Sequence, residues 1–240
     1  MWQGGKMSIK KIITGLTLSL LLSSGVASAA DFSKGFQAAK AGDFKTALAE
    51  WTPLAVQGNA NAQVMLGVMY DSGEGVPQNQ KTAVKWFTLA AEQGQSYAQN
   101  NLGRMYDFGR GVPQNYKTAA KWYTLAAEQG NFDAQYNLGV MYADGQGVPE
   151  NDKTAVKWYT KAAEQGHADA QGNLGVMYSK GEGVLTDIKR AYMWCNLASY
   201  NGNEIGGENK DKLAKQMTSV DISKAQDMSS RCLESNYTDC

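Results

Sequence analysis

Residues 62–94 read AQVMLGVMYDSGEGVPQNQKTAVKWFTLAAEQG, and this frame returns with a period of 36 residues through most of the chain. Its first nine residues, 62–70, recur in similar form at 98–106, 134–142 and 170–178. The closing glycine keeps one register without insertions, at Gly58, Gly94, Gly130, Gly166 and Gly202. Self-similarity at a fixed period of this length is the signature of a repeat architecture. The sequence therefore predicts a stack of equal units.

Each unit is expected to form two helices joined by a loop. Ala62, Leu66 and Tyr70 fall four residues apart, which places them on one face of a helix. Gly67 lies beside this face, where the missing side chain would let the second helix approach closely. A Gly-Glu-Gly-Val-Pro loop follows, and the second helix carries a buried face that includes Phe87. One position just before that helix always holds a residue that can cap it: Asn79, Asn115, Asn151 and Asp187.

The repeat frame also predicts the domain organisation. Four 36-residue units cover 59–94, 95–130, 131–166 and 167–202. Residues 31–58 carry a shortened form of the frame and are expected to form an N-terminal capping hairpin. Residues 203–240 depart from the frame, with helices expected near 209–216 and 218–234 and a capping box at Thr218 and Asp221. This C-terminal segment would cover the hydrophobic face that a terminal repeat leaves open.

Residues 1–30 are predicted to be a signal peptide. Lys6, Lys10 and Lys11 precede a short apolar run at 12–22, and small residues suit cleavage near Ala29 or Ala30. The mature protein would be periplasmic or secreted, and no other apolar stretch is long enough to span a membrane. Removing three lysines and no acidic residue leaves 20 basic and 23 acidic side chains. That balance argues against a nucleic-acid partner, which would need a concentrated basic surface.

The repeated residues resemble the Sel-1-like repeat, a helical hairpin related to the tetratricopeptide repeat. The resemblance rests on Ala-Gln-x-x-Leu-Gly-x-x-Tyr at 62–70, Gly-x-Gly-Val-Pro-x-Asn at 73–79 and Lys-Thr-Ala-x-Lys-Trp-Phe at 81–87, and it covers residues 59–202. It implies an all-α fold, a right-handed superhelical solenoid of αα-hairpins whose first helices line the concave side. It also implies a non-enzymatic adaptor or scaffold that binds a protein or peptide partner, with no cofactor.

Partner recognition is expected on the first helices, at positions that differ from repeat to repeat, because positions that recur unchanged are constrained by stacking. The mixture of aromatic, basic and acidic groups there is typical of a peptide-binding surface. An ordinary solvated face is the alternative. These candidate partner-binding residues, called here the first-helix surface, are Tyr97, Asn100, Arg104, Asp107, Phe108, Asp133, Tyr136, Asp169, Ser179 and Lys180.

The recurring tryptophans, Trp86, Trp122, Trp158 and Trp194, are predicted to pack in the core, where they seal the contact between successive hairpins. The alternative is an aromatic ladder that binds sugars, and with it a second function: a binder of cell-wall glycan or of a β-lactam, with weak β-lactamase-type hydrolase activity. The residues themselves predict no catalytic or metal site. His167 is the only histidine, is expected to be exposed, and has no second histidine with which to share a metal.

The positions of the three cysteines and the predicted oxidising compartment indicate which of them are bonded. Cys195 occupies the repeat position of Phe87, so it is expected to be a buried free thiol. Cys232 and Cys240 are expected to form a disulfide that pins the terminal segment onto the last helix. A bond from Cys195 to either of the other two cysteines is the alternative.

Overall fold

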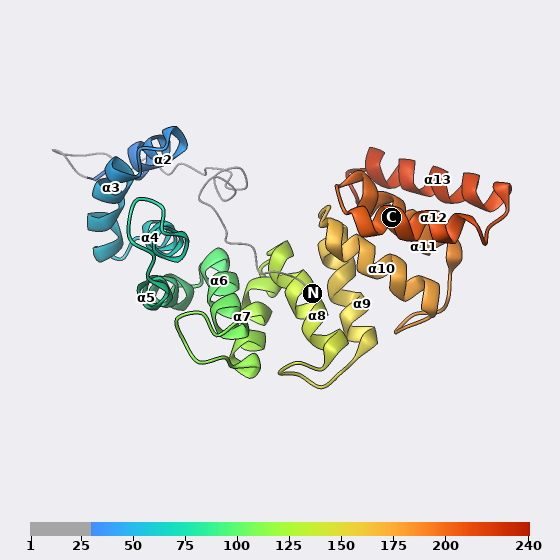
Figure 1. The fold of residues 1–240 in the computed structure, drawn as a ribbon, viewed down its shortest axis with the longest axis horizontal. Coiled ribbons are helices and arrows are strands. Elements are labelled where there is room, and N and C mark those ends of the chain that lie inside the picture. The colour runs from blue at the N-terminus through green and yellow to red at the C-terminus, as the bar shows by residue number, and fades with distance from the viewer. Residues whose placement is uncertain (1–29) are drawn as a thin grey trace. The chain divides into compact units, whose positions relative to one another are not determined.

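The computed structural model describes residues 30–240, so the predicted signal peptide lies outside the described residues. Within residues 30–240 there are twelve helices and no strand, which confirms the expected all-α fold (Figure 1). The helices are α2 Phe32–Ala41, α3 Phe44–Val56, α4 Ala60–Ser72, α5 Gln80–Glu92, α6 Ser96–Asp107, α7 Tyr116–Glu128, α8 Phe132–Asp144, α9 Asp152–Ala163, α10 Ala168–Lys180, α11 Ile188–Tyr200, α12 Glu204–Ala214 and α13 Ser219–Glu234.

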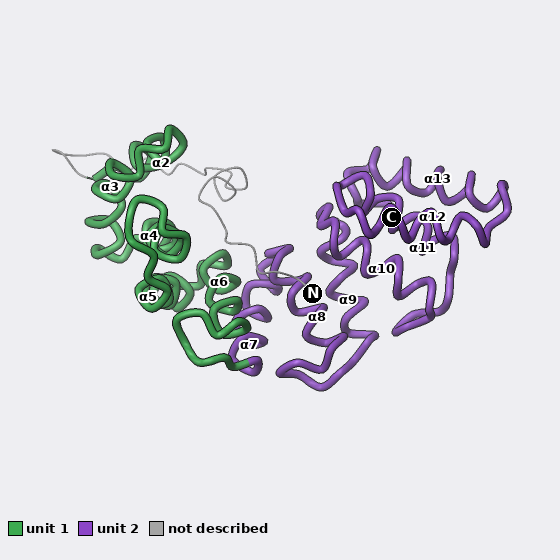
Figure 2. The backbone as a smooth tube through the Cα atoms, viewed as in Figure 1, with its two compact units in different colours: residues 1–115 green, residues 116–240 purple. Residues whose placement is uncertain are grey.

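The chain divides into two compact units, residues 1–115 and residues 116–240 (Figure 2). In the described part of the first unit, α2 packs on α3 and α4 packs on α5, and α6 then packs on α5. In the second unit, α8 pairs with α9 and α10 pairs with α11. The last two helices, α12 and α13, both pack against α11. The pairs α4–α5, α8–α9 and α10–α11 are hairpins that the 36-residue frame predicts.

The close packing within each pair depends on a glycine in the first helix. A Cβ atom at Gly67 in α4 would overlap the ring of Phe87 in α5, and one at Gly139 in α8 would overlap the ring of Tyr159 in α9. Both rings are almost completely buried. The expectation that a missing side chain lets the second helix approach is therefore confirmed.

The prediction that the four tryptophans fill the core is right for Trp194 alone, which is 4% exposed. Trp86, Trp122 and Trp158 are only half-buried. The residue that follows each of them, Phe87, Tyr123 or Tyr159, takes the core position. The physical reason is helical geometry: the aromatic ring that faces the glycine gap is one residue further along, so the tryptophan is rotated by about 100° toward the edge of the helix.

Two capping positions recur in the frame. Asn79, Asn151 and Asp187 accept hydrogen bonds from backbone N–H groups at the starts of α5, α9 and α11, as predicted. A second set, which was not predicted, caps the first helix of each pair. Its members all accept a bond from the N–H group three residues later: Asn59, Gln95, Asn131, His167 and Asn203.

A buried glutamine connects each repeat to its neighbours. Gln135 Nε2 donates to the Ala127 carbonyl oxygen over 3.1 Å, and Gln171 Nε2 donates to the Ala163 carbonyl oxygen over 3.0 Å. Each glutamine oxygen in turn accepts a bond from the amide 30 residues later, Gln165 in one case and Asn201 in the other. The same arrangement joins Gln63 to Ala55 and Gln93 in the first unit.

The C-terminal segment differs from its prediction at one boundary. α12 begins at Glu204, five residues before the expected start, because Asn203 caps it and Gly206 packs directly on Ala198. Gly206 and Gly207 therefore lie inside a helix. In α13, Thr218 accepts from the Asp221 N–H group, as expected for the capping box. Ala225 and Cys232 are fully buried.

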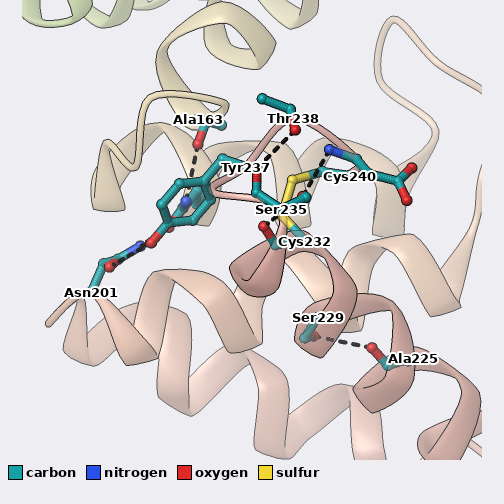
Figure 3. Close-up of a disulfide and its surroundings, with 11 residues drawn as sticks. Ala163, Asn201, Ala225, Ser229, Cys232, Ser235, Tyr237, Thr238 and Cys240 are labelled. Carbon is teal, nitrogen blue, oxygen red and sulfur yellow. Dashed lines mark hydrogen bonds between the residues drawn. A yellow bond between two sulfur atoms is a disulfide. The ribbon is translucent and has the colours of Figure 1, made fainter.

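The expected disulfide is confirmed: Cys232 and Cys240 are bonded, with their Cα atoms 4.7 Å apart (Figure 3). The segment between them folds back, and the Tyr237 N–H group donates to the Cys232 carbonyl oxygen over 2.7 Å. Cys195 is a free, fully buried thiol, also as predicted. Burial raises the pKa of Cys195 to about 11, so the thiol stays protonated at neutral pH.

Candidate protein-interaction surface

In the first unit, half of the predicted first-helix surface lies on α6. Tyr97, Arg104 and Asp107 are half-buried, and Phe108, the residue after the helix, is 44% exposed. Asn100 is fully buried, so its side chain is not presented at the surface. The burial of Asn100 has no signal in the sequence, because valine, tyrosine and glycine take the same position in the other repeats.

In the second unit, Tyr136 is at the centre of a group of side chains from successive repeats. Its ring stacks on the imidazole of His167, with ring centroids 4.5 Å apart and an angle of 18° between the planes. Phe132, one turn earlier on α8 and 40% exposed, meets the same imidazole edge-on at 5.9 Å. The three rings form a continuous aromatic surface that joins the start of α8 to the start of α10.

Carboxylates surround this aromatic surface. Asp133 Oδ1 lies 3.7 Å from His167 Nε2, and Asp169 Oδ1 accepts a hydrogen bond from Asn203 Nδ2 over 2.7 Å. Burial, reinforced by the negative charges of Asp169 and Asp144, raises the pKa of Tyr136 to about 12. Tyr136 is therefore neutral at physiological pH, and the net charge around it is negative.

His167 is not the exposed residue that the sequence predicted. Its side chain is only 12% exposed, and its Nδ1 accepts a hydrogen bond from the Ala170 N–H group over 3.2 Å. Burial lowers the pKa of His167 from its ordinary value, against the opposing pull of Asp133 and Asp169. A neutral ring with an unprotonated Nδ1 is what the capping role requires. The signal for this role was the repeat position that His167 shares with Asn59 and Asn131.

Ser179 and Lys180 lie at the other end of α10, away from this capped end. The Ser179 hydroxyl donates to the Val176 carbonyl oxygen over 2.7 Å, and Lys180 Nζ lies 3.4 Å from Glu182 Oε1. Of the residues predicted in the second unit, the structure thus brings together Asp133, Tyr136 and Asp169. His167 and Asn173, which were not predicted, also belong to this group. The Asn173 side chain is hydrogen-bonded to both Tyr136 and Tyr159.

This arrangement is suited to binding. A partly exposed aromatic surface can pack against an apolar or cationic side chain, and the adjacent carboxylates favour a positive charge there. In the described chain, residues 30–240, none of the helices has both the length and the apolar character needed to cross a bilayer.

Comparisons with known proteins agree with the geometry. The Sel1 repeat model matches residues 60–95, 96–131, 132–167 and 168–203. Among solved structures, the chain is similar to a protective antigen of uropathogenic Escherichia coli strains that displays an SLR fold, with 37% identity and a TM-score of 0.75. That match covers 81% of this chain and 43% of the antigen, so this chain spans less than half of the antigen's length.

Two further structures are similar. A Sel1 repeat protein from Oxalobacter formigenes is 35% identical, with a TM-score of 0.68 and coverage of 73% of this chain and 72% of that one. A structure from Klebsiella pneumoniae is 22% identical over 75% of this chain and 89% of that one, with a TM-score of 0.50, and shows likeness of fold alone. The search of curated proteins found no match. Because four matched repeats cover more than half of its length, the protein belongs to the Sel1 repeat family.

Proposed function

We propose that the protein is an exported, non-enzymatic adaptor that binds a partner protein through its first-helix surface. The observation that carries the proposal is the group around Tyr136. The His167 ring stacks on Tyr136 and meets Phe132 edge-on, and Asp133 and Asp169 lie beside these rings. Other repeats hold different residues at the positions of Phe132 and Tyr136. A surface whose side chains change from repeat to repeat can select one partner sequence.

The partner segment at this group carries a lysine or an arginine. The rings of Phe132 and Tyr136 offer faces to its aliphatic stem, and Asp133 and Asp169 attract its charge. The Cys232–Cys240 disulfide supports a location outside the cytoplasm, because such bonds persist in oxidising compartments.

The proposal is tested by site-specific crosslinking in the producing cell. A photoreactive phenylalanine analogue replaces Tyr97 or Tyr136, and in the control it replaces Lys157, an exposed residue of the second helix α9. We expect discrete crosslinked proteins from Tyr97 and Tyr136 and none from Lys157. Replacing both Asp133 and Asp169 with asparagine should reduce capture at position 136. Capture from Lys157 alone would contradict the proposal.

The same purified protein distinguishes the adaptor from a cell-wall or β-lactam binder. Co-sedimentation with isolated peptidoglycan and hydrolysis of a chromogenic β-lactam are measured directly. An adaptor gives neither signal above that of the protein after heat denaturation. Saturable co-sedimentation, or turnover of the β-lactam, would replace the adaptor with the alternative function.

A further inference from the structure

The C-terminal tail shows how one edge of the repeat stack can hold a tyrosine. The Tyr237 ring lies against Gly166, at the turn between α9 and α10: a Cβ atom at Gly166 would be 3.2 Å from Tyr237 Cε2. Its hydroxyl donates to Asn201 Oδ1 over 3.0 Å and lies 2.9 Å from Asn201 Nδ2 (Figure 3). Ala163, Gly166, Gln171 and Asn201 are called here the Gly166 groove.

One repeat earlier, in the same compact unit, Ala127, Gly130, Gln135 and Gln165 hold the equivalent positions and are called here the Gly130 groove. The two grooves share their internal bonds. Gln135 donates to Ala127 as Gln171 donates to Ala163, at 3.1 and 3.0 Å. Gln165 donates to Gln135 as Asn201 donates to Gln171, at 2.7 and 2.9 Å. The two grooves are therefore lined by the same hydrogen-bonded amide side chains in equivalent positions.

The Gly130 groove, unlike its equivalent, is open. A Cβ atom at Gly130 would meet no atom within 4 Å, where the equivalent atom at Gly166 meets Tyr237. The groove forms part of a hollow of about 550 Å³, which is closed on one side by the tail residues Tyr237 and Thr238. Among residues 30–240, no donor is bonded to Gln165 Oε1, the atom equivalent to the Asn201 oxygen that accepts the Tyr237 hydroxyl.

We propose that the Gly130 groove binds a tyrosine side chain from a turn of a partner protein, alongside the tail. The ring would pack over Gly130 as Tyr237 packs over Gly166, and its hydroxyl would donate to Gln165 Oε1. Glu128, Lys161 and Glu164 line the rim, so charges of both signs are available to the residues that flank the tyrosine. The groove shares no residue with the first-helix surface, and it extends the proposed function to a second contact area.

The test uses the full chain, with its own disulfide intact, and a probe peptide that copies residues 232–240 closed by the same disulfide. Binding is measured by fluorescence anisotropy for the peptide and for a version in which its tyrosine is phenylalanine. Each is measured against the wild-type protein, Gln165→Ala, and the control Gln57→Ala. Gln57 holds the same repeat position in the N-terminal hairpin.

We expect saturable binding of the tyrosine peptide. Loss of one hydrogen bond should weaken it about three- to tenfold, whether the hydroxyl is removed from the peptide or Gln165 is changed. Because both changes remove the same bond, the two together should weaken binding little more than either alone. Gln57→Ala should leave binding unchanged.

The location is read by replacing the peptide's tyrosine with a photoreactive phenylalanine and mapping the crosslinks. Crosslinks within 127–135 and at 161–162 support the proposal. It is overturned if no saturable binding occurs, if the Gln165 and hydroxyl changes weaken binding independently, or if crosslinks map to residues 163–171 and 201 because the peptide displaces the tail. Self-association of the protein that the peptide reverses would assign the groove to a second copy and would also overturn it.

Discussion

At the residue scale, the buried glutamines combine two roles that other side chains could not fill together. Gln171 is fully buried, donates to a backbone carbonyl of the preceding helix and accepts from Asn201. An amide carries both a donor and an acceptor, whereas a carboxylate lacks the donor and an ammonium lacks the acceptor. Gln171 therefore satisfies a buried helix end and also joins two repeats.

Gln171→Ala should lower the free energy of unfolding by about 1–3 kcal/mol, because the Ala163 carbonyl would stay buried without its donor. Urea unfolding followed by circular dichroism measures the change. Gln165→Ala is the matched control, since Gln165 is exposed and water can replace its bonds. Equal losses for the two variants would show that the buried glutamine has no special role.

His167 makes stability depend on pH. Burial lowers its pKa below the ordinary value of 6.5, so the unfolded chain takes up a proton at a higher pH than the folded chain. The contribution of His167 to the free energy of unfolding should be fully present above about pH 6.5 and should fall as the pH decreases below that value. Protonation would also remove the Nδ1 acceptor that caps α10.

His167→Asn keeps an acceptor at the capping position, as at Asn131, and removes the titrating group. We expect the variant to lose most of the decrease in unfolding free energy between pH 7.5 and pH 5.5. Urea midpoints of both proteins at the two pH values provide the measurement. An unchanged pH dependence in the variant would mean that another group dominates this range.

At the element scale, two glycines in α10 have opposite consequences for packing. A Cβ atom at Gly175 would overlap Cys195 Sγ and lie 3.1 Å from the Ala191 carbonyl oxygen in α11. A Cβ atom at Gly172 would meet nothing closer than 3.6 Å. Only Gly175 is needed for the approach of the second helix, although both glycines lower the intrinsic stability of the helix.

Gly175→Ala should destabilise the protein by about 1–3 kcal/mol through overpacking. Gly172→Ala, in the same helix, should stabilise it by about 0.5–1 kcal/mol, because alanine favours the helical backbone. Thermal and urea unfolding of the two variants show directly whether each substitution stabilises or destabilises the protein. If both variants are stabilised, the α10–α11 contact is looser than the distances indicate.

At the scale of the whole molecule, the described chain is two compact units in which most packing is between sequence neighbours. The tail is an exception: Tyr237 reaches Gly166 and Asn201, and the disulfide holds it there. Closing so short a loop contributes about 2–3 kcal/mol, through the entropy of the unfolded chain.

Thiol counting tests the covalent structure of the whole chain. The folded, unreduced protein should react slowly with a maleimide, because its free thiol at Cys195 is buried and its pKa is about 11. Unfolded without reductant, the protein should gain one tag, and unfolded with reductant it should gain three. Mass spectrometry should place the single tag on Cys195. A tag on Cys232 or Cys240 would mean that Cys195 forms the disulfide.

Much of the fold could be predicted because the sequence holds four similar repeats, so a feature inferred from one repeat is supported by the other three. The caps Asn79, Asn151 and Asp187, the glycine gap at Gly67 and the Cys232–Cys240 bond are local or periodic features. The site was less accessible to prediction. The burial of Asn100 and the stacking of Tyr136 on His167 depend on neighbours that are distant in the sequence.

By itself, the sequence determined that this protein is a helical stack of period 36, because helix faces, caps and glycine gaps follow from spacing along one chain. Only the tertiary structure decided that Tyr136 stacks on His167 and that Phe87, Tyr123 and Tyr159 take the core positions expected for the tryptophans that precede them. It also decided that Tyr237 fills one groove and leaves its equivalent open. These outcomes depend on which side chains contact one another across repeats. A periodic pattern specifies the helix face on which a side chain lies but not the residues of other repeats that it contacts.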